Sequence, residues 1–313
     1  MQKNKLPIIS IIGPTCMGKS SLALELHNQY PVEIISVDSV MIYKDLNIGT
    51  DKPDENILSR IKHNLVNIKN PDETFSVGEF LNITNKLIQQ IHDKKKIPLL
   101  VGGTSMYFNQ LFNGLNNLPE KSSQERSFID FLAKKYGWVA LYKVLSHIDS
   151  EFTARVEKND KQRIQRALEV YLLSGKPLSS FFVNSKRLEN KYKLVTFKLF
   201  SSNRKTLHDL IEKRTNKMFK KGFIDEVELI KKNYPISSNS QSMRSIGYSH
   251  ILRFLDNEIN YDELIETCIY STRQLAKRQI TWLKKFKDGI EIDTISSDRN
   301  KVLGIINKNL HFL

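Results

Sequence analysis

LPIISIIGPTCMGKS, residues 6–20, is the stretch of sequence that decides the fold of this chain. Residues 6–12 form a short apolar run that is typical of a buried strand. Residues 13–20 match the pattern G-x-x-x-x-G-K-S, and a helical pattern begins directly after them at Ser21. The order of strand, glycine loop and helix predicts a phosphate-binding loop, because a chance glycine turn lacks this context.

The loop is expected to bind a di- or triphosphate group. Its backbone N–H groups can turn toward a polyphosphate, and the start of the next helix adds unpaired donors and the positive end of its dipole. Lys19 supplies a positive charge, and the Ser20 hydroxyl is a suitable ligand for Mg²⁺. The candidate phosphate-binding residues are Gly13, Pro14, Thr15, Cys16, Met17, Gly18, Lys19 and Ser20.

Length and charge bound the class of protein. A chain of 313 residues is long enough for one large domain or a domain with an insertion. The formal net charge of +14 favours a polyanionic partner, with nucleic acid as the first candidate. A genome biased toward Lys, Asn and Ile would produce the same charge without any partner, so charge alone leaves both interpretations open.

The cysteines and apolar runs exclude several classes. Only Cys16 and Cys268 occur, far apart in the sequence, which excludes a zinc module and a disulfide framework and favours the cytosol. No apolar run approaches the roughly 20 residues that cross a bilayer. The N-terminal residues lead directly into the first strand and are not expected to be a signal peptide.

Four apolar runs predict buried parallel strands, at residues 6–12, 32–37, 97–101 and 194–200. Helical patterns separate them, so the predicted fold is α/β, with a phosphate-loop-type parallel sheet flanked by helices. Ligands bind beyond the carboxyl ends of the strands in such sheets. The phosphate loop, Asp38-Ser39 and Gly102-Gly103-Thr104 each follow one of these strands, and we expect them to converge.

The strand signal disappears between residues 113 and 190, where four helical patterns are found at 124–136, 138–145, 150–156 and 161–173. We expect a helical insertion domain over 113–190, with the α/β core formed by residues 1–112 and 191–313. Residues 113–119 are the expected linker into the insertion, and 186–193 the return. After residue 200 the patterns are again helical, at 204–221, 224–232, 243–255 and 261–286.

Asp38 has three possible roles from its position alone. A carboxylate beside a phosphate loop can bind Mg²⁺ or accept a proton from a nucleophile, and it can also cap a turn. Thr104 offers a hydroxyl at a strand end, although an ordinary strand-to-helix turn has the same sequence character.

Two later helical patterns are basic. Gln162, Arg163 and Arg166 suit phosphates and base edges, but a solvated basic face has the same pattern. Arg273, Lys277 and Lys284 recur on one stripe of the last long helix, which fits either a nucleic-acid groove or a plain amphipathic helix.

Taken together, these motifs resemble the tRNA dimethylallyltransferases, also called tRNA isopentenyltransferases, in their bacterial form. The resemblance extends through nearly the whole chain. It rests on GPTCMGKS (13–20), DSVMIY (38–43), NIGTDKP (47–53), FSV (75–77), GGTSMY (102–107), NDKQRIQRALEV (159–170), SMRSIGY (242–248) and RQLAKRQ (273–279).

The resemblance implies transfer of a dimethylallyl group from dimethylallyl diphosphate to the exocyclic amine of the adenosine 3′ of the anticodon in tRNA. It implies that the phosphate loop holds the diphosphate leaving group with Mg²⁺, and that Asp38, Thr104 and Lys19 are catalytic. The implied partners are tRNA and the allylic donor. Apart from the resemblance, the composition leads us to expect a cytoplasmic protein with no membrane contact. No obligate protein partner is expected, with a monomer as the default. The helical insertion would grip the anticodon stem.

The resemblance also implies a set of tRNA-binding residues from several segments of the chain. They are Asp38, Ser39, Val40, Met41, Thr104, Arg126, Gln162, Arg163, Ile164, Gln165, Arg166, Arg244, Gly247, Tyr248, Lys277, Arg278 and Lys284. Met41 departs from the family, which usually has Gln there, and a thioether cannot hydrogen-bond a base edge as an amide does.

Two other functions remain to be discriminated. A small-molecule phosphotransferase or nucleoside kinase would use the same loop with ATP, but it gives no reason for the high positive charge. An RNA-binding protein with a decayed loop is the third possibility, and the intact Lys19, Ser20 and Asp38 argue against it.

Overall fold

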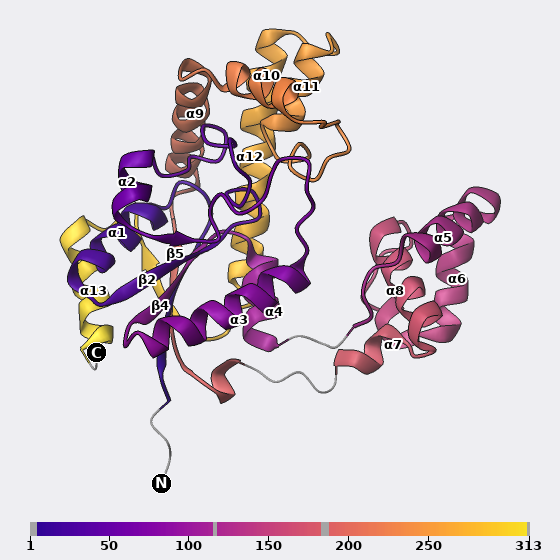
Figure 1. Ribbon diagram of the computed structural model, residues 1–313, viewed down its shortest axis with the longest axis horizontal. Helices are drawn as coiled ribbons and strands as arrows, with labels where there is room; N and C mark the ends of the chain where they lie inside the picture. The colour runs from indigo at the N-terminus through magenta and orange to yellow at the C-terminus, as the bar shows by residue number, and fades with distance from the viewer. Residues whose placement is uncertain (1–4, 115–117, 183–187, 312–313) are drawn as a thin grey trace. The chain divides into compact units, whose positions relative to one another are not determined.

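The computed structural model describes residues 5–114, 118–182 and 188–311. Its centre is a six-stranded parallel sheet with the strand order β3-β2-β4-β1-β5-β6 (Figure 1). The strands are β1 (Pro7–Ile12), β2 (Val32–Val37), β3 (His63–Asn64), β4 (Ile97–Gly102), β5 (Lys193–Phe200) and β6 (Ile290–Asp293). The four predicted strands and the α/β fold class are confirmed, whereas β3 and β6 at the two edges were missed.

Helices cover both faces of this sheet. They are α1 (Lys19–Gln29), α2 (Glu55–Arg60), α3 (Val77–Asp93), α4 (Ser105–Asn113), α9 (Arg204–Lys220), α10 (Phe223–Asn233), α11 (Tyr248–Leu255), α12 (Tyr261–Leu283) and α13 (Arg299–Leu310). Successive strand residues point to opposite faces, so Ile9 and Ile11 pack against α1, α9 and α13. Ile8 and Ile12 face the other core, which contains residues of α3, α4, α10 and α11.

A second compact unit interrupts the first. One unit contains residues Met1–Phe112 and Leu188–Leu313, and the other contains Asn113–Arg187. The second unit is helical, with α5 (Ser123–Tyr136), α6 (Trp138–Ile148), α7 (Ser150–Thr153), α8 (Lys161–Ser174) and the 3₁₀ helix η1 (Leu178–Phe182). It has its own core around Ile129, Leu145 and Ile164. We expected the insertion to span 113–190, and part of its predicted linker and return, at 115–117 and 186–187, lies outside the described residues.

Several predicted helices differ from the structure at an end, and the one predicted at 138–145 continues to Ile148. The pattern at 243–255 becomes a helix only at Tyr248. Gly247 precedes it with φ +91°, where a Cβ would come within 2.6 Å of the Phe223 ring, so the backbone there turns instead of continuing a helix. The helix predicted at 150–156 ends at Thr153, and that predicted at 261–286 ends at Leu283.

Capping residues define several helix starts. Ser76 and Glu79 form a reciprocal capping box at the start of α3. Asn260 and Glu263 do the same for α12, which carries one of the basic motifs. Across the residues that the structure describes, no helix combines the length and the apolar character that a membrane span requires.

Candidate active site

The ends of three neighbouring strands bring the predicted motifs to one edge of the sheet. β4 lies between β2 and β1, and its last residue, Gly102, pairs with Val37 of β2 and with Ile12 of β1. The residues that follow these three positions are Asp38, Gly103 and Gly13. The convergence expected from the strand pattern is therefore present in the structure.

The phosphate loop has the backbone form of an anion-binding nest. Cys16 has φ +63° and Gly18 has φ +70°, two left-handed positions separated by Met17. Alternating right- and left-handed residues turn successive N–H groups to one side. The Met17 side chain is buried in the core under α1, and Ser20 is exposed in the first turn of that helix. The loop is therefore anchored by one side chain, while Gly18 and Ser20 on either side of Lys19 are exposed.

Two cations lie at this loop. The Lys19 ammonium donates to the Pro14 carbonyl at 2.6 Å, and the Arg214 guanidinium of α9 donates to the Thr15 hydroxyl. Burial, and then the positive charge of Arg214, lower the pKa of Lys19 to about 8, although Asp38 and Cys16 act in the opposite direction. Two cations that repel each other in a partly buried place are stabilised by a bound anion.

The lowered pKa of Lys19 predicts a pH dependence for anion binding. Above about pH 8 the free protein loses the Lys19 proton, and binding of diphosphate must then take a proton up. We expect the affinity for inorganic diphosphate to fall by up to about tenfold per pH unit above this point. Calorimetry from pH 7 to 9.5 measures this, and Lys19→Arg is the control, because arginine stays charged throughout. The prediction would be contradicted if diphosphate affinity fell with pH in the same way in the wild-type protein and in Lys19→Arg.

Asp38 is held by the turn that follows it. One carboxylate oxygen, Oδ1, accepts the N–H groups of Val40 at 2.8 Å and Met41 at 3.2 Å. The Thr104 hydroxyl accepts the Ser39 N–H at 3.1 Å, so the turns after β2 and β4 are joined. The capping interpretation of Asp38 is thus correct for one oxygen, and the half-buried side chain remains available for a second role.

Sequence reasoning missed two residues that contact the loop. Besides its bond to Thr15, Arg214 lies 3.4 Å from the Asp51 carboxylate. The Gln279 amide of α12 accepts the Thr15 N–H and donates to the Gly103 carbonyl. Arg214 had no motif to mark it, because it lies in a generally basic helix far along the chain. Gln279 lies within the RQLAKRQ motif, but its contacts depend on tertiary structure.

The NIGTDKP motif forms a tightly held loop beside the site. The Glu226 carboxylate of α10 accepts the N–H groups of Asn47, Ile48 and Gly49, at 2.7 to 3.3 Å. Lys52 donates to the Tyr43 carbonyl and to the side-chain oxygens of two asparagines, Asn47 and Asn67. Burial lowers the pKa of Lys52 to about 8. This motif therefore acts as structural support.

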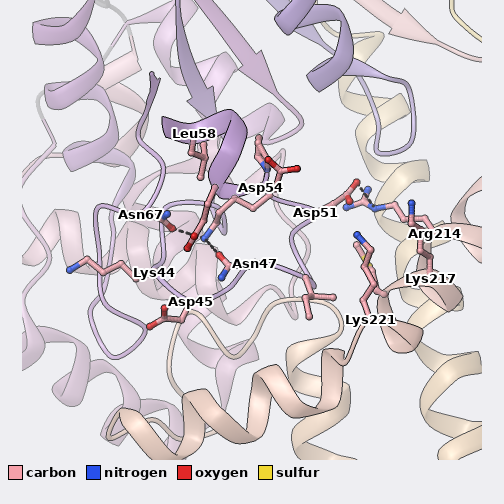
Figure 2. Close-up of a pocket in the computed structure, with 15 residues that line it drawn as sticks. Lys44, Asp45, Asn47, Asp51, Asp54, Leu58, Asn67, Arg214, Lys217 and Lys221 are labelled. Atoms are coloured by element: carbon pink, nitrogen blue, oxygen red, sulfur yellow. Dashed lines mark hydrogen bonds and ion pairs between the residues drawn. The ribbon is translucent and has the colours of Figure 1, made fainter. Parts of the chain in front are cut away.

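A pocket of about 550 Å³ lies between this loop and α9 (Figure 2). Arg214 and Lys217 of α9 and Lys221 at its end line the pocket, and Asp51 pairs with Arg214 in the same wall. Arg214 of α9 thus lines the pocket and also contacts the phosphate loop through the Thr15 hydroxyl. Carboxylates and cations line the pocket together, so its charge does not select a ligand of one sign.

In the helical unit, two predicted tRNA-binding residues, Arg126 and Arg166, form ion pairs with the buried carboxylate of Glu169. The Glu169 side chain has no exposed surface and accepts bonds from Arg126 at 2.8 Å and Arg166 at 2.7 Å. The Ser122 N–H is a further donor to Glu169. Burial raises the pKa of Glu169, but these bonds outweigh it and lower the pKa to about 2. Arg126 and Arg166 therefore stabilise the unit whatever else they bind.

Removing this carboxylate should destabilise the helical unit. Glu169→Gln leaves two guanidinium groups without their counter-charge, and we expect a loss of about 3 kcal/mol in opening free energy. Hydrogen exchange in α5 and α8 of the whole protein measures it. Glu151→Gln, which removes the partner of exposed Arg155, should change the same quantity by less than about 1 kcal/mol. Because the pKa of Glu169 is lowered, its contribution should be lost only as the pH falls from about 4.5 toward 2.

Two other predicted tRNA-binding side chains are corrected by the structure. Ile164 and Tyr248 have no exposed surface, and the Tyr248 hydroxyl donates to Glu226 at 2.7 Å. These side chains complete the cores, and neither residue presents exposed surface to an external ligand.

The remaining candidates differ in exposure. Arg163 pairs with Asp160 at 3.3 Å and Gln165 bonds Asp130. The exposed polar side chains among the predicted tRNA-binding residues are Gln162, Arg163, Arg244, Lys277, Arg278 and Lys284.

The oxygen donors of the site determine whether it suits magnesium. Within the described ranges, no cluster of three or more His, Cys, Asp or Glu side chains suits a metal ion. Mg²⁺ is usually held by few protein groups together with substrate phosphate oxygens. The exposed Ser20 hydroxyl and the Asp38 carboxylate are hard oxygen donors of this kind, so these residues fit the ion.

Comparison with known proteins identifies relatives along the whole chain. The family model for IPP transferase matches residues 41–286. A tRNA dimethylallyltransferase from Legionella pneumophila is 44% identical over 93% of this chain and 92% of its own length. One from Nitrosomonas europaea is 41% identical over 91% of this chain and 90% of its own.

Solved structures of two transferases are also similar to this chain. A full-length tRNA isopentenylpyrophosphate transferase from Bacillus halodurans is 32% identical, covers 99% of this chain and 96% of its own, and has a TM-score of 0.71. A eukaryotic dimethylallyltransferase crystallised acting on tRNA has a TM-score of 0.84 at 26% identity, over 98% of this chain and 79% of its own. The extent of the family match and the identity over nearly full length show that this chain belongs to the IPP transferase family, the tRNA dimethylallyltransferases.

Proposed function

We propose that the chain transfers the dimethylallyl group of dimethylallyl diphosphate to the exocyclic amine of the adenosine 3′ of the anticodon in tRNA. In this reaction the bond between the allylic carbon and the diphosphate oxygen breaks, and a carbon–nitrogen bond forms. The amine loses one proton and diphosphate departs. The observation that carries the proposal is the convergence of an anion nest and a carboxylate at one edge of the sheet.

The phosphate loop is proposed to hold the diphosphate. Inward N–H groups between Cys16 and Ser20 and the charges of Lys19 and Arg214 all oppose the negative charge that develops on the leaving group. Groups that are already oriented toward such charge lower the barrier, because they need no reorganisation during the reaction. In this role Lys19 is catalytic and Arg214 is a second cation for the same anion.

Ser20 is proposed to hold Mg²⁺ together with the diphosphate oxygens. When bound, the ion neutralises charge on the leaving group. The loop N–H groups and Lys19 also stabilise this negative charge, so they and the ion would act together on the diphosphate oxygens.

Asp38 is proposed to accept the amine proton. Its Oδ1 is occupied by two backbone N–H groups, which hold the carboxylate in one orientation while the other oxygen remains for the amine. Thr104 keeps the turn of Ser39 in place through its hydroxyl. The allylic carbon can carry positive charge, so a weakly nucleophilic amine suffices.

The tRNA is proposed to bind through exposed cations. Lys277, Arg278 and Lys284 lie on or just after α12, and Arg244 lies before α11. The target base must leave the stack to reach Asp38, and the helical unit is proposed to grip the anticodon stem. We further propose that the chain acts as a cytoplasmic monomer.

The test combines purified protein, dimethylallyl diphosphate, Mg²⁺ and unmodified tRNA, with nucleoside analysis by mass spectrometry. Isopentenyladenosine is the expected product. Its absence, together with ATP consumption on a small acceptor, would support a kinase instead. As a second measurement, tRNA affinity should fall steeply between about 50 and 200 mM salt, because phosphate contacts release counterions. A flat salt response would argue against a nucleic-acid substrate.

A further inference from the structure

One side chain of α12 bridges the two halves of the active site. The Gln279 Oε1 accepts the Thr15 N–H at 3.0 Å, and its Nε2 donates to the Gly103 carbonyl at 2.9 Å. These partners fix the orientation of the amide, because a flipped group would place oxygen against oxygen and N–H against N–H. Both ends of the half-buried amide are therefore used within the protein.

The two partners belong to different functional motifs. Thr15 is part of the phosphate loop, and its hydroxyl is also bound by Arg214. Gly103 immediately precedes Thr104, whose hydroxyl holds the turn of Asp38 and Ser39. A path of hydrogen bonds and peptide links thus runs from the proposed diphosphate cradle through Gln279, Gly103 and Thr104 to Ser39. Ser39 directly follows the proposed proton acceptor, Asp38.

The glycine at position 103 is independent evidence for this arrangement. A Cβ built on Gly103 would lie 2.5 Å from the Gln279 Nε2, while the next nearest atom, the Gly13 carbonyl oxygen, would be 3.4 Å away. The close approach that excludes a side chain here is therefore with Gln279. Because the obstructing atom is the end of a flexible side chain, alanine at 103 should displace the amide without unfolding the protein.

We infer that Gln279 is a positioning residue that sets the separation between the diphosphate cradle and the proton acceptor. This inference rests on the proposed function. Gln279 acts through Thr15 and Gly103 and does not contact substrate. Transfer requires the allylic carbon and the amine to be aligned between the two motifs, and a misplacement of about 1 Å can reduce a rate by about 10²-fold.

The experiment is a double-mutant cycle with Gln279→Ala and Gly103→Ala in the whole protein. We expect each single variant to lower kcat by about 10²-fold, with tRNA Kd changed by less than about twofold. Both changes disrupt the same contact. The loss of kcat in the double variant should therefore remain near 10²-fold and not reach about 10⁴-fold, the product of the two single losses. Gln89→Ala, at an exposed amide of α3 that bonds Asp93, is the matched control and should keep wild-type kcat.

Two outcomes would overturn the inference. One is wild-type turnover in Gln279→Ala. The other is a loss of kcat in the double variant that equals the product of the losses in the two single variants. Thermal melting of each variant separates loss of positioning from loss of folding. If Gln279→Ala does not fold, Gln279→Met, which keeps a similar volume without either hydrogen bond, takes its place in the cycle. Failure of the wild-type protein to modify tRNA would instead refute the proposed function itself.

Discussion

Lys19→Met is expected to reduce kcat/KM for dimethylallyl diphosphate by about 10³-fold. Lys19 is the point charge of the nest, and it lies close enough to Arg214 for the guanidinium to lower its pKa. Methionine has a similar length without the charge, so the departing diphosphate would lose one of its two protein cations. Steady-state kinetics with varied donor, at saturating tRNA and constant pH 7.5, measures the effect.

The control for this variant is Lys308→Met on α13, an exposed position outside the site. It removes the same charge from the protein as a whole, so it should leave kcat/KM for the donor within about twofold of wild type. The tRNA affinity of Lys19→Met should also stay unchanged. If donor kcat/KM of Lys19→Met remains within tenfold of wild type, the loop does not bind the diphosphate as proposed.

Asp38→Asn is expected to bind tRNA normally and to lose about 10³-fold in kcat, because an amide cannot accept the amine proton. Asparagine retains an oxygen in the place of Oδ1, so the bonds from Val40 and Met41 can persist. The variant therefore separates proton acceptance from turn capping. Single-turnover transfer to tRNA, with a parallel filter-binding measurement, reads out the two properties.

Asp298→Asn is the matched control for this substitution. Asp298 caps α13 by accepting the Lys301 N–H at 2.9 Å, and asparagine is an equally good cap. We expect wild-type turnover from it. Turnover near wild type in Asp38→Asn would show that the carboxylate only caps its turn, and a loss of tRNA binding would show that the change disturbs more than the proton acceptor.

The convergence of the three strand-end motifs was predictable because it depends on local pattern and on parallel strand order. Buried strands with a motif at each carboxyl end must present those motifs at one edge. The resulting prediction, that the loop, Asp38 and Thr104 converge, agrees with the pairing of Gly102 with Ile12 and Val37. The glycines after β4 were weak signals alone, and their meaning came from what packs beside them.

Predictions about exposed or paired side chains were less successful, because a helical pattern does not name the partner across a contact. Arg166 was placed on a basic helix face and Arg126 was implied as a tRNA contact by the resemblance, but the buried Glu169 bonds both. Tyr248 lies in a predicted binding segment, and the structure places it fully inside, bonded to Glu226. Arg126 and Tyr248 bond glutamates that are distant in sequence, so spacing carries no record of those two pairs. Arg166 and Glu169 are only three residues apart on α8, but the spacing does not show that Glu169 is buried.

The sequence by itself determined the phosphate loop, the parallel strands, the helical insertion and the family, since each depends on short patterns in a fixed order. Only the tertiary structure decided which distant side chains complete the site. Arg214 and Gln279 reach Thr15 from α9 and α12, some two hundred residues or more along the chain. Their roles arise from packing of helices on the sheet, where hydrogen-bond partners are chosen by distance in space and not by distance along the chain.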